Sequence, residues 1–341
     1  MKIGDGLLDS AGKLAAAIVS PGKAVVITDS NVDRLYADRL CESLRSEGFN
    51  PVKYVIPAGE SSKNPQNLIS ILNFLAENRL TRSGTVFALG GGVVGDISGL
   101  AASLYMRGIS LIQLPTTLLS AVDSSVGGKT AINLETGKNL VGAFYQPDLV
   151  ICDTDTLSTL PSDELSNGFA EVIKYGFIRD SSLLELLRTP AELNMPEIIE
   201  RCVSIKRDIV TRDERDLGER QLLNFGHTFG HAIEKCSNYK VPHGHAVARG
   251  MMIITAACVK KGICDDSILE LLRDLLIKYN LPLDPAFSEE RIFEVVLSDK
   301  KRMSDRFNLV VPRSLGRCEL LNLSLSEVRE YLNMGLEALR A

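Results

Sequence analysis

The chain has 341 residues, with 38 Lys or Arg against 43 Asp or Glu, for a formal net charge of −5. Hydrophobic residues make up 45% and charged residues 24%, a composition that excludes a disordered chain. Its longest apolar run, 251–259, is about half the length that a bilayer requires, so no membrane partner is expected. A slightly acidic chain without a Lys/Arg tract also argues against nucleic-acid binding.

The cysteine pattern and the N-terminus indicate the compartment. The seven Cys are scattered, their number is odd, and no C-x-x-C occurs. The first residues contain no apolar signal segment. We therefore expect reduced thiols and a cytoplasmic location.

The N-terminal part alternates short apolar runs with helix-length segments. The runs are rich in Val and Ile and do not alternate with polar residues, which is typical of strands buried on both faces. They are Ala24–Thr28, Val52–Ile56, Thr85–Leu89, Ile109–Leu114 and Leu149–Cys152, with helices expected at Val32–Gly48 and Pro65–Arg79. This order predicts an α/β domain with a Rossmann-like, doubly wound parallel sheet over residues 1–155, with ligands at the carboxyl ends of its strands.

From residue 156 the pattern becomes helical. Helices are expected at Ser162–Ile178, Glu197–Arg212, Gln221–Cys236, Gly244–Lys261 and Asp266–Tyr279. Strand-like runs almost vanish until Phe307–Val311. We predict an all-α C-terminal domain over residues 156–341.

Two glycine-rich segments are candidate phosphate sites. The segment Gly90–Gly95 matches G-x-G-x-x-G between a strand and a helix, but no acidic residue lies about 20 residues later, so a tight packing turn is an equal alternative. The segment Gly127-Gly128-Lys129-Thr130 resembles the end of a P-loop, but Asp123 occupies the position of the required first Gly. We reject a nucleotide P-loop and keep Lys129 as a candidate anion ligand.

All four histidines lie between residues 227 and 245. His227 and His231 are spaced i, i+4 on one helix face, and His243 and His245 open the next helix. Each alone is explained by a capping or surface role, but together they favour a divalent-metal site, with His227 and His231 as co-ligands by spacing. Glu171, in an otherwise apolar helix, is the candidate carboxylate.

Several cations sit in glycine-rich or apolar surroundings, which suggests a small polyanionic substrate. Arg220 lies seven residues before His227, two helical turns away, so we expect both on one helix face. The cations are Arg107, Lys129, Lys138, Lys174, Lys206, Arg220 and Lys300. The residues alone thus indicate a dinucleotide-binding, metal-dependent enzyme acting on a small anion.

Six blocks of the chain resemble, in order, the motifs of the 3-dehydroquinate synthases, a family of sugar phosphate cyclases. They are Ala88–Asp96, Leu114–Leu119, Val122–Thr130, Gly137–Pro147, Gly168–Gly176 and Leu223–Glu234. The resemblance implies a lyase of the shikimate pathway, which supplies aromatic amino acid biosynthesis. Such an enzyme converts 3-deoxy-D-arabino-heptulosonate 7-phosphate to 3-dehydroquinate and phosphate by transient NAD oxidation, phosphate elimination, re-reduction and aldol closure. It also implies a fold similar to that of glycerol dehydrogenases.

The resemblance also implies the cofactor and metal residues. A divalent zinc or cobalt ion would be held by Glu171, His227 and His243, which moves His231 from the metal to the phosphate side of the substrate. NAD would be bound by Asp29, Asn31, Gly59, Glu60, Lys63, Gly91, Gly92, Val93, Asp96, Thr116, Thr117, Lys129, Lys138, Thr156, Leu157, Ser158 and Thr159.

The remaining implied residues act on the substrate. Arg107 would reach the phosphate in a neighbouring subunit, which implies a homodimer, and Asn139 would lie between cofactor and substrate. The other groups are Asp123, Lys129, Lys174, Asn224, His231, Lys206, Arg220 and Lys300. Departures from the family pattern include Ala58-Gly59-Glu60 in place of Asp-Gly-Glu and His243-Gly244-His245 in place of His-Gly-Glu.

Three alternatives share parts of this pattern. A metal-dependent polyol or glycerol phosphate dehydrogenase would share the fold and metal site but not need the Asp123–Lys129 block. Another sugar phosphate cyclase would share almost every motif, although a substrate without a carboxylate has less use for Lys206 and Arg220. A non-catalytic binding protein would have no reason to gather Glu171 with four histidines.

Overall fold

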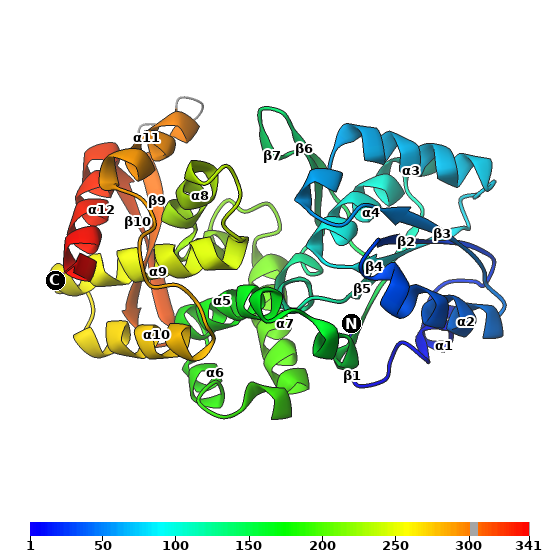
Figure 1. Ribbon diagram of the computed structural model, residues 1–341, viewed down its shortest axis with the longest axis horizontal. Helices are drawn as coiled ribbons and strands as arrows, with labels where there is room; N and C mark the ends of the chain where they lie inside the picture. Colours follow the sequence, from blue (N-terminus) through cyan, green and yellow to red (C-terminus); the bar gives the residue numbers. More distant parts are fainter. Residues whose placement is uncertain (301–305, 341) are drawn as a thin grey trace. The chain divides into compact units, whose positions relative to one another are not determined.

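The computed structural model describes residues 1–300 and 306–340, without the side chains of Glu192, Asp299 and Lys300 (Figure 1). The chain divides into two compact units, Met1–Leu160 (unit 1) and Pro161–Ala341 (unit 2). The boundary expected after residue 155 falls inside a short 3-10 helix, Thr154–Thr159, at the end of unit 1.

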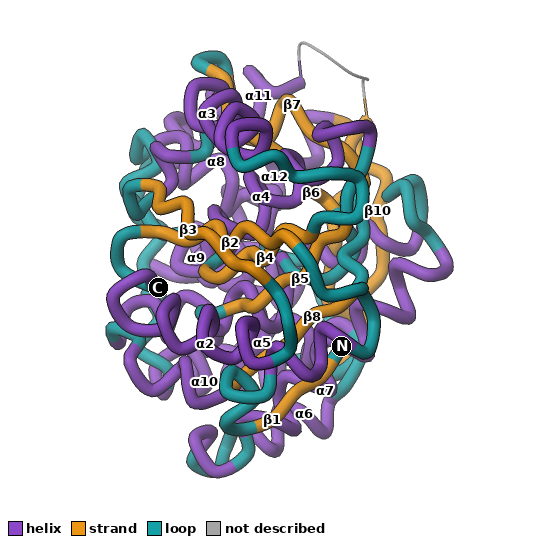
Figure 2. The backbone as a smooth tube through the Cα atoms, turned by 90° about the vertical axis from the view of Figure 1, so that its right-hand side faces the viewer, coloured by secondary structure: helices purple, strands orange, loops and turns teal. Residues whose placement is uncertain are grey.

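Unit 1 is built on a six-stranded sheet in which every pair of neighbouring strands is parallel. The strand order is β1-β8-β5-β4-β2-β3, and Figure 2 shows these strands side by side. Their bounds are β1 (Lys2–Gly4), β2 (Lys23–Asp29), β3 (Asn50–Ile56), β4 (Thr85–Gly90), β5 (Ser110–Pro115) and β8 (Leu149–Asp153). The predicted parallel sheet is confirmed, with the three-residue β1 as an addition.

Alternate residues of the central strands pack on opposite faces of this sheet. Val25 and Ile27 of β2 belong to one buried cluster, and Ala24 and Val26 to the other. All four side chains are fully buried. Burial on both faces explains why the strands read as continuous apolar runs in the sequence.

Four helices cover the two faces: α1 (Ala11–Ala16), α2 (Asp38–Ser46), α3 (Pro65–Glu77) and α4 (Gly92–Leu104). The helix expected at Val32–Gly48 divides into a π-helical turn, Asp33–Ala37, and α2. Asn64 caps α3 by accepting a hydrogen bond from the amide of Asn67 at 2.8 Å.

A two-stranded antiparallel hairpin, β6 (Lys129–Leu134) and β7 (Gly137–Phe144), lies apart from the main sheet. It packs on α4 where Gly99 meets Thr130, because a methyl group at Gly99 would lie 2.4 Å from Thr130 Cγ2. The sequence pattern did not predict this hairpin.

Unit 2 is mainly helical. Its helices are α5 (Ser162–Ile178), α6 (Ser181–Leu186), α7 (Met195–Arg212), α8 (His227–Cys236), α9 (His243–Lys260), α10 (Asp266–Lys278), α11 (Glu289–Lys300) and α12 (Leu325–Arg340). The helix expected over Gln221–Cys236 is wrong in its first turns. A 3-10 helix ends at Asn224, and α8 begins after Gly226, whose φ of 80° breaks the helix.

Unit 2 also contains an antiparallel pair, β9 (Arg306–Ser314) and β10 (Arg317–Ser324). The prediction of a helical C-terminal domain holds, but "all-α" needs this correction: the strand-like run at Phe307–Val311 forms β9 and its partner follows directly. Among the described residues, we find no helix with the length and apolarity that a membrane crossing requires.

Candidate functional site

Three helices of unit 2 bring together Glu171, His227 and His243. Glu171 lies in the middle of α5, while His227 and His243 are the first residues of α8 and α9. Glu171 Oε1 is 3.7 Å from His227 Nε2 and 3.6 Å from His243 Nε2, and one ligand atom from each residue lies within 4.8 Å of the others. Ligand atoms bound at about 2.1 Å to a tetrahedral ion lie about 3.4 Å apart, so the three residues fit a divalent metal.

Glycines allow these helices to approach closely enough for the ligands to converge. A methyl group at Gly244 would lie 1.9 Å from the carbonyl oxygen of Asn167 in α5, and one at Gly250 would lie 1.9 Å from the carbonyl oxygen of Gly226. The amide of Gly244 also donates to Asn167 Oδ1 at 2.5 Å. Any larger side chain at these glycines would push the starts of α8 and α9 away from Glu171.

The second nitrogen of each ligand histidine has a hydrogen-bond partner. Nδ1 of His227 lies 3.2 Å from the carbonyl oxygen of Phe225, and Nδ1 of His243 lies 3.2 Å from Glu234 Oε2. Because both partners accept, each Nδ1 donates and each Nε2 faces Glu171. Partners of this kind fix the orientation of metal-binding imidazoles.

The centre is buried and strongly charged. Glu171 is fully buried and its Oε2 pairs with the ammonium of Lys174, which is itself only 1% exposed. Burial, aided by the charge of Lys174, lowers the pKa of His227 well below its ordinary value. Burial also opposes the charged form of His243, but hydrogen bonds with Glu171 and Glu234 raise its pKa to about 10.

His231 lies next to this centre but on another side of it. Its ring centroid is 5.2 Å from that of His227 and 5.9 Å from that of His243. Among the described residues a second possible metal group joins His231 to Glu234 and His243. The spacing of His227 and His231 suggested that both bind one ion, but neither group contains both residues. The group of Glu171, His227 and His243 is the one that the family resemblance implied.

Unit 2 also buries two further cations. Lys206, on α7, is 7% exposed and Arg220 is 2% exposed. The expectation that Arg220 shares a helix face with His227 is wrong, since the chain breaks at Gly226 between them. Arg220 Nη1 instead donates to the carbonyl oxygen of Glu214 at 2.5 Å. Asn224 ends the 3-10 helix with an exposed side chain, and the side chain of Lys300 lies outside the described residues.

In unit 1, the glycine-rich turn joins β4 directly to α4. Gly91 caps α4, which begins at Gly92 and contains Val93 and Asp96, and Gly90 accepts a hydrogen bond from the amide of Thr116 at 3.1 Å. A methyl group at Gly91 would lie 3.0 Å from Thr117 Cγ2. The turn thus combines close packing with a helix N-terminus that can face an anion, so its two interpretations are compatible.

Two acidic residues of the predicted cofactor set, Asp29 at the end of β2 and Asp96 in α4, have defined partners. Asp29 Oδ1 accepts hydrogen bonds from the amides of Asn31 at 2.8 Å and Val32 at 3.1 Å. Asp96 Oδ2 pairs with Lys63 Nζ at 2.5 Å, and Lys63 is 5% exposed. Asp29 therefore shapes the turn after β2, and the Lys63–Asp96 pair anchors the turn after β3 to α4.

The remaining unit 1 candidates lie in several separate segments. Arg107 ends the 3-10 helix after α4 with a φ of 69°, Asp123 lies in the π-helical turn Ser120–Ser124, and Lys129 is the exposed first residue of β6. Tyr36 holds the Thr154–Thr159 helix, its hydroxyl donating to the carbonyl oxygen of Thr156 at 3.2 Å and lying 2.6 Å from Thr159 Oγ1. Gly59, with a φ of 108°, precedes Glu60. Leu157, Ser158, Lys138 and Asn139 complete the predicted set.

Two residues that the sequence analysis missed contact predicted site residues. Glu234 lies three positions after His231 on the same helix, so helical spacing could have indicated it. Asn133 contacts Glu60 and the backbone of Asn139, and only the irregular pairing of the hairpin brings it there.

Solved structures with this architecture include cyclases of sugar phosphates. A structure of 2-deoxy-scyllo-inosose synthase complexed with carbaglucose-6-phosphate, NAD+ and Co2+ has a TM-score of 0.87 and 25% identity, covering 97% of this chain and 95% of its own. The 2-epi-5-epi-valiolone synthase from Streptomyces hygroscopicus, with NAD+ and Zn2+ bound, has a TM-score of 0.88 and 26% identity, covering 99% and 96%. The fold is therefore that of the sugar phosphate cyclases.

The sequence comparisons narrow this class. The family model described as 3-dehydroquinate synthase N-terminal matches residues 53–167, and the one described as 3-dehydroquinate synthase C-terminal matches residues 168–302. A 3-dehydroquinate synthase from Clostridium acetobutylicum is 45% identical over 336 residues, which are 96% of this chain and 94% of the relative. The chain belongs to the 3-dehydroquinate synthase family.

Proposed function

We propose that the chain is a carbon–oxygen lyase that converts 3-deoxy-D-arabino-heptulosonate 7-phosphate to 3-dehydroquinate and phosphate, in the shikimate pathway. The observation that carries the proposal is the 45% identity to a 3-dehydroquinate synthase along nearly the whole of both chains. The cluster of Glu171, His227 and His243 supports it, because this chemistry requires hydroxyls to be acidified beside a carbonyl.

Glu171, His227 and His243 would hold a zinc or cobalt ion, and the candidate residues of unit 1 would hold NAD. The chemistry that these groups supply when bound is reversible hydride transfer and a lowered pKa of substrate hydroxyls. Gly91, Gly92 and Val93 would present the N-terminus of α4 to the pyrophosphate. Asp29, Asn31, Glu60 and Lys63 supply polar groups at the ends of β2 and β3, and residues Thr156–Thr159 complete the site.

The substrate carries a phosphate and a carboxylate, and the chain offers cations for both. Arg220 reads the carboxylate, since a guanidinium binds a planar carboxylate through two hydrogen bonds. Lys129, Lys174, Lys206 and Lys300 bind the other oxygens, with Asp123, Asn139 and Asn224 orienting hydroxyls. Burial of Lys174, Lys206 and Arg220 strengthens their attraction for an anion, because water screens them little. His231 lies on the phosphate side.

Arg107 would complete the phosphate site of a neighbouring subunit, so the enzyme would be a homodimer. This assignment of Arg107 is based on its exposed side chain and on its backbone. It lies on a turn in which Met106 and Arg107 both have positive φ, of 50° and 69°. Such conformations are costly for residues with side chains and are kept where a function needs them.

All seven cysteines of the chain are free thiols, which supports a cytoplasmic location.

Phosphate release in the presence of substrate and NAD tests the proposal against a dehydrogenase. A cyclase releases phosphate without net formation of NADH, because the cofactor is reduced and then reoxidised in each turnover. Accumulation of NADH in proportion to substrate consumed would instead support the metal-dependent polyol or glycerol phosphate dehydrogenase.

A further inference from the structure

The β6–β7 hairpin contains an irregularity at the predicted site residues Lys138 and Asn139. Ile132 pairs with Val141, but the next pair is Leu134 with Gly137, so Lys138, Asn139 and Leu140 together lie opposite Asn133. Asn139 has a φ of 55°, an uncommon conformation for a residue with a side chain. Extra residues of this kind leave the strand ladder and re-aim side chains, often beside functional sites.

Asn133 uses its backbone amide and both ends of its side chain to connect this bulge to another turn. Its backbone amide donates to the carbonyl oxygen of Lys63 at 2.8 Å, and its Nδ2 donates to Glu60 Oε1 at 2.7 Å. Its Oδ1 accepts from the amide of Asn139 at 2.9 Å. The orientation of the side-chain amide is unambiguous, because a carboxylate only accepts and a backbone amide only donates.

The turn on the other side of Asn133 is itself firmly held. Lys63 Nζ pairs with Asp96 of α4 at 2.5 Å and lies 3.9 Å from Glu60 Oε1. Lys63 is buried, and α3 begins two residues later at Pro65. The turn that Asn133 contacts is therefore a firmly held anchor and not a loose loop.

We propose that Asn133 is a positioning residue that couples the Glu60–Lys63 turn to the Lys138–Asn139 bulge. The inference rests on the proposed function, in which Glu60 and Lys63 bind NAD and the bulge lies between cofactor and substrate. Cofactor binding to the turn then fixes the backbone of Asn139, and with it the Lys138 and Asn139 side chains, in the geometry that receives the substrate. Cofactor and substrate binding become cooperative through one side chain.

Two substitutions distinguish the hydrogen bond of Asn133 with Glu60 from its hydrogen bond with the Asn139 amide. Asn133→Ala removes both side-chain hydrogen bonds. Asn133→Asp keeps an acceptor for the Asn139 amide but places a carboxylate against Glu60. Asn50→Ala, at an exposed asparagine on the first residue of β3, is the matched control. All three proteins are compared with the wild type for NAD affinity by calorimetry, hydrogen exchange at the Asn139 amide, and steady-state kinetics at saturating NAD.

In the wild type and the control, NAD is expected to slow hydrogen exchange at Asn139. Asn133→Ala should raise the Kd of NAD by about threefold to tenfold, the effect of one lost hydrogen bond. It should also abolish the NAD-dependent slowing at Asn139 and raise the KM of the sugar phosphate even when NAD saturates. Asn133→Asp should retain slow exchange at Asn139 without NAD yet still bind NAD more weakly.

Normal NAD-dependent slowing at Asn139 and an unchanged KM in Asn133→Ala would overturn the coupling. If Asn133→Ala fails to fold, Asn133→Asp with wild-type NAD affinity would overturn it alone. A wild-type protein that does not bind NAD would contradict the proposed function and the coupling together, so the two failures are distinguishable.

Discussion

Glu234 Oε2 lies 3.2 Å from Nδ1 of His243, on the opposite side of the imidazole from Glu171. Glu234 is 5% exposed, so this hydrogen bond is shielded from water. Glu234 thereby holds the His243 ring with Nε2 directed at the metal position. The contact is a carboxylate–histidine pair of the kind that supports metal ligands in other proteins.

Glu234→Ala should therefore weaken zinc binding by about 10-fold to 100-fold, because His243 loses the partner that orients it. Glu234→Gln keeps an acceptor and should have a smaller effect. Competition with a chromophoric chelator measures the zinc Kd directly, without reference to activity. Glu270→Gln, at an exposed position of α10, is the control. Equal zinc affinity in Glu234→Ala and the wild type would remove Glu234 from the metal centre.

Glu171→Ala should abolish stoichiometric zinc binding and also destabilise unit 2. It leaves the buried ammonium of Lys174 without its carboxylate partner, and breaking a buried pair in this way costs about 3–5 kcal/mol. Metal content by atomic absorption and urea unfolding by circular dichroism measure the two effects. Glu164→Ala, exposed in the first turn of the same helix, should change neither. Retention of one equivalent of zinc by Glu171→Ala would show that the site is misassigned.

Arg220→Lys should lower kcat/KM by about 10-fold or more, since one charge-assisted hydrogen bond is worth roughly 1.5–3 kcal/mol. A lysine cannot reproduce the two parallel hydrogen bonds of a guanidinium. NAD affinity should not change, and a substrate analogue without the carboxylate should bind both proteins equally. If that analogue discriminates between the two proteins as strongly as the substrate does, Arg220 does not read the carboxylate.

Arg107→Ala should be complemented in hybrid dimers. Mixing it with a variant that is inactive only at the metal site should restore some activity, because one of the two sites then has both an intact metal centre and an Arg107 from the other subunit. Each variant alone should be nearly inactive. An absence of recovery after verified subunit exchange would argue against a shared site.

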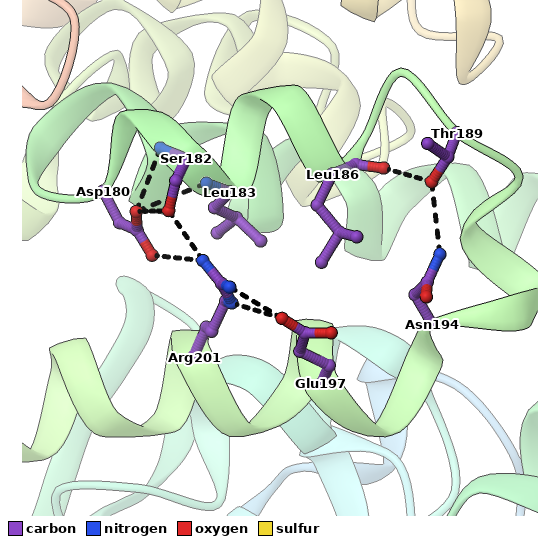
Figure 3. A network of polar contacts seen from close by, with 8 residues as sticks. All are labelled: Asp180, Ser182, Leu183, Leu186, Thr189, Asn194, Glu197 and Arg201. Atoms are coloured by element: carbon purple, nitrogen blue, oxygen red, sulfur yellow. Dashed lines mark hydrogen bonds and ion pairs between the residues drawn. The ribbon is translucent and has the colours of Figure 1, made fainter.

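Asp180 should contribute stability that depends on pH. It caps α6 through hydrogen bonds from Ser182 and Leu183 and pairs with Arg201 of α7 at 3.3 Å (Figure 3). Burial alone would raise the pKa of this carboxyl, but the hydrogen bond from the Ser182 side chain and the charge of Arg201 outweigh burial and lower it below 3.8. A lowered pKa in the folded state stabilises the protein above the unfolded-state pKa, and this contribution is lost as the pH falls through the folded-state pKa.

Two substitutions separate the cap from the charge. Asp180→Ala should lower the free energy of unfolding at neutral pH by about 1 kcal/mol, the usual worth of an N-cap. Asp180→Asn keeps a good cap and should cost less. Urea unfolding at pH 7 and at pH 3 provides the comparison: the difference between the wild type and Asp180→Asn should shrink at the lower pH. A difference that grows on acidification would contradict this account.

The parallel sheet was predictable because strands buried on both faces leave a direct signature, as in Ala24–Thr28. The break at Gly226 was not, since a single glycine in a helical pattern is compatible with continuation. Its positive φ, and the close approach of Val247 and Met251 that leaves no room for a Cβ, appear only in the folded chain. Because this break was not predicted, the expectation that Arg220 and His227 share a helix face was wrong. The convergence of His227 with Glu171 does not depend on a continuous helix before His227.

The contacts of Asn133 and Glu234 could not be predicted from the spacing of residues in the sequence. Asn133 contacts Glu60 and Lys63, some 70 residues earlier in the chain, from the irregular part of the hairpin, where three residues of β7 oppose one residue of β6. Glu234 carries a helical-spacing signal, but that signal would also fit a surface glutamate. What distinguishes Glu234 from a surface glutamate is its burial beside His243. This burial results from the packing of α8 on α9 through Gly230.

Identification of the product tests the central claim most directly. The purified protein, supplied with zinc, 3-deoxy-D-arabino-heptulosonate 7-phosphate and an amount of NAD far below that of the substrate, should convert all of the substrate. Nuclear magnetic resonance of the mixture should show 3-dehydroquinate and inorganic phosphate in equal amounts, with NAD unconsumed. Another carbocycle as the product would assign the chain to a different cyclase reaction, and a halt after one equivalent of NAD would contradict the proposed function.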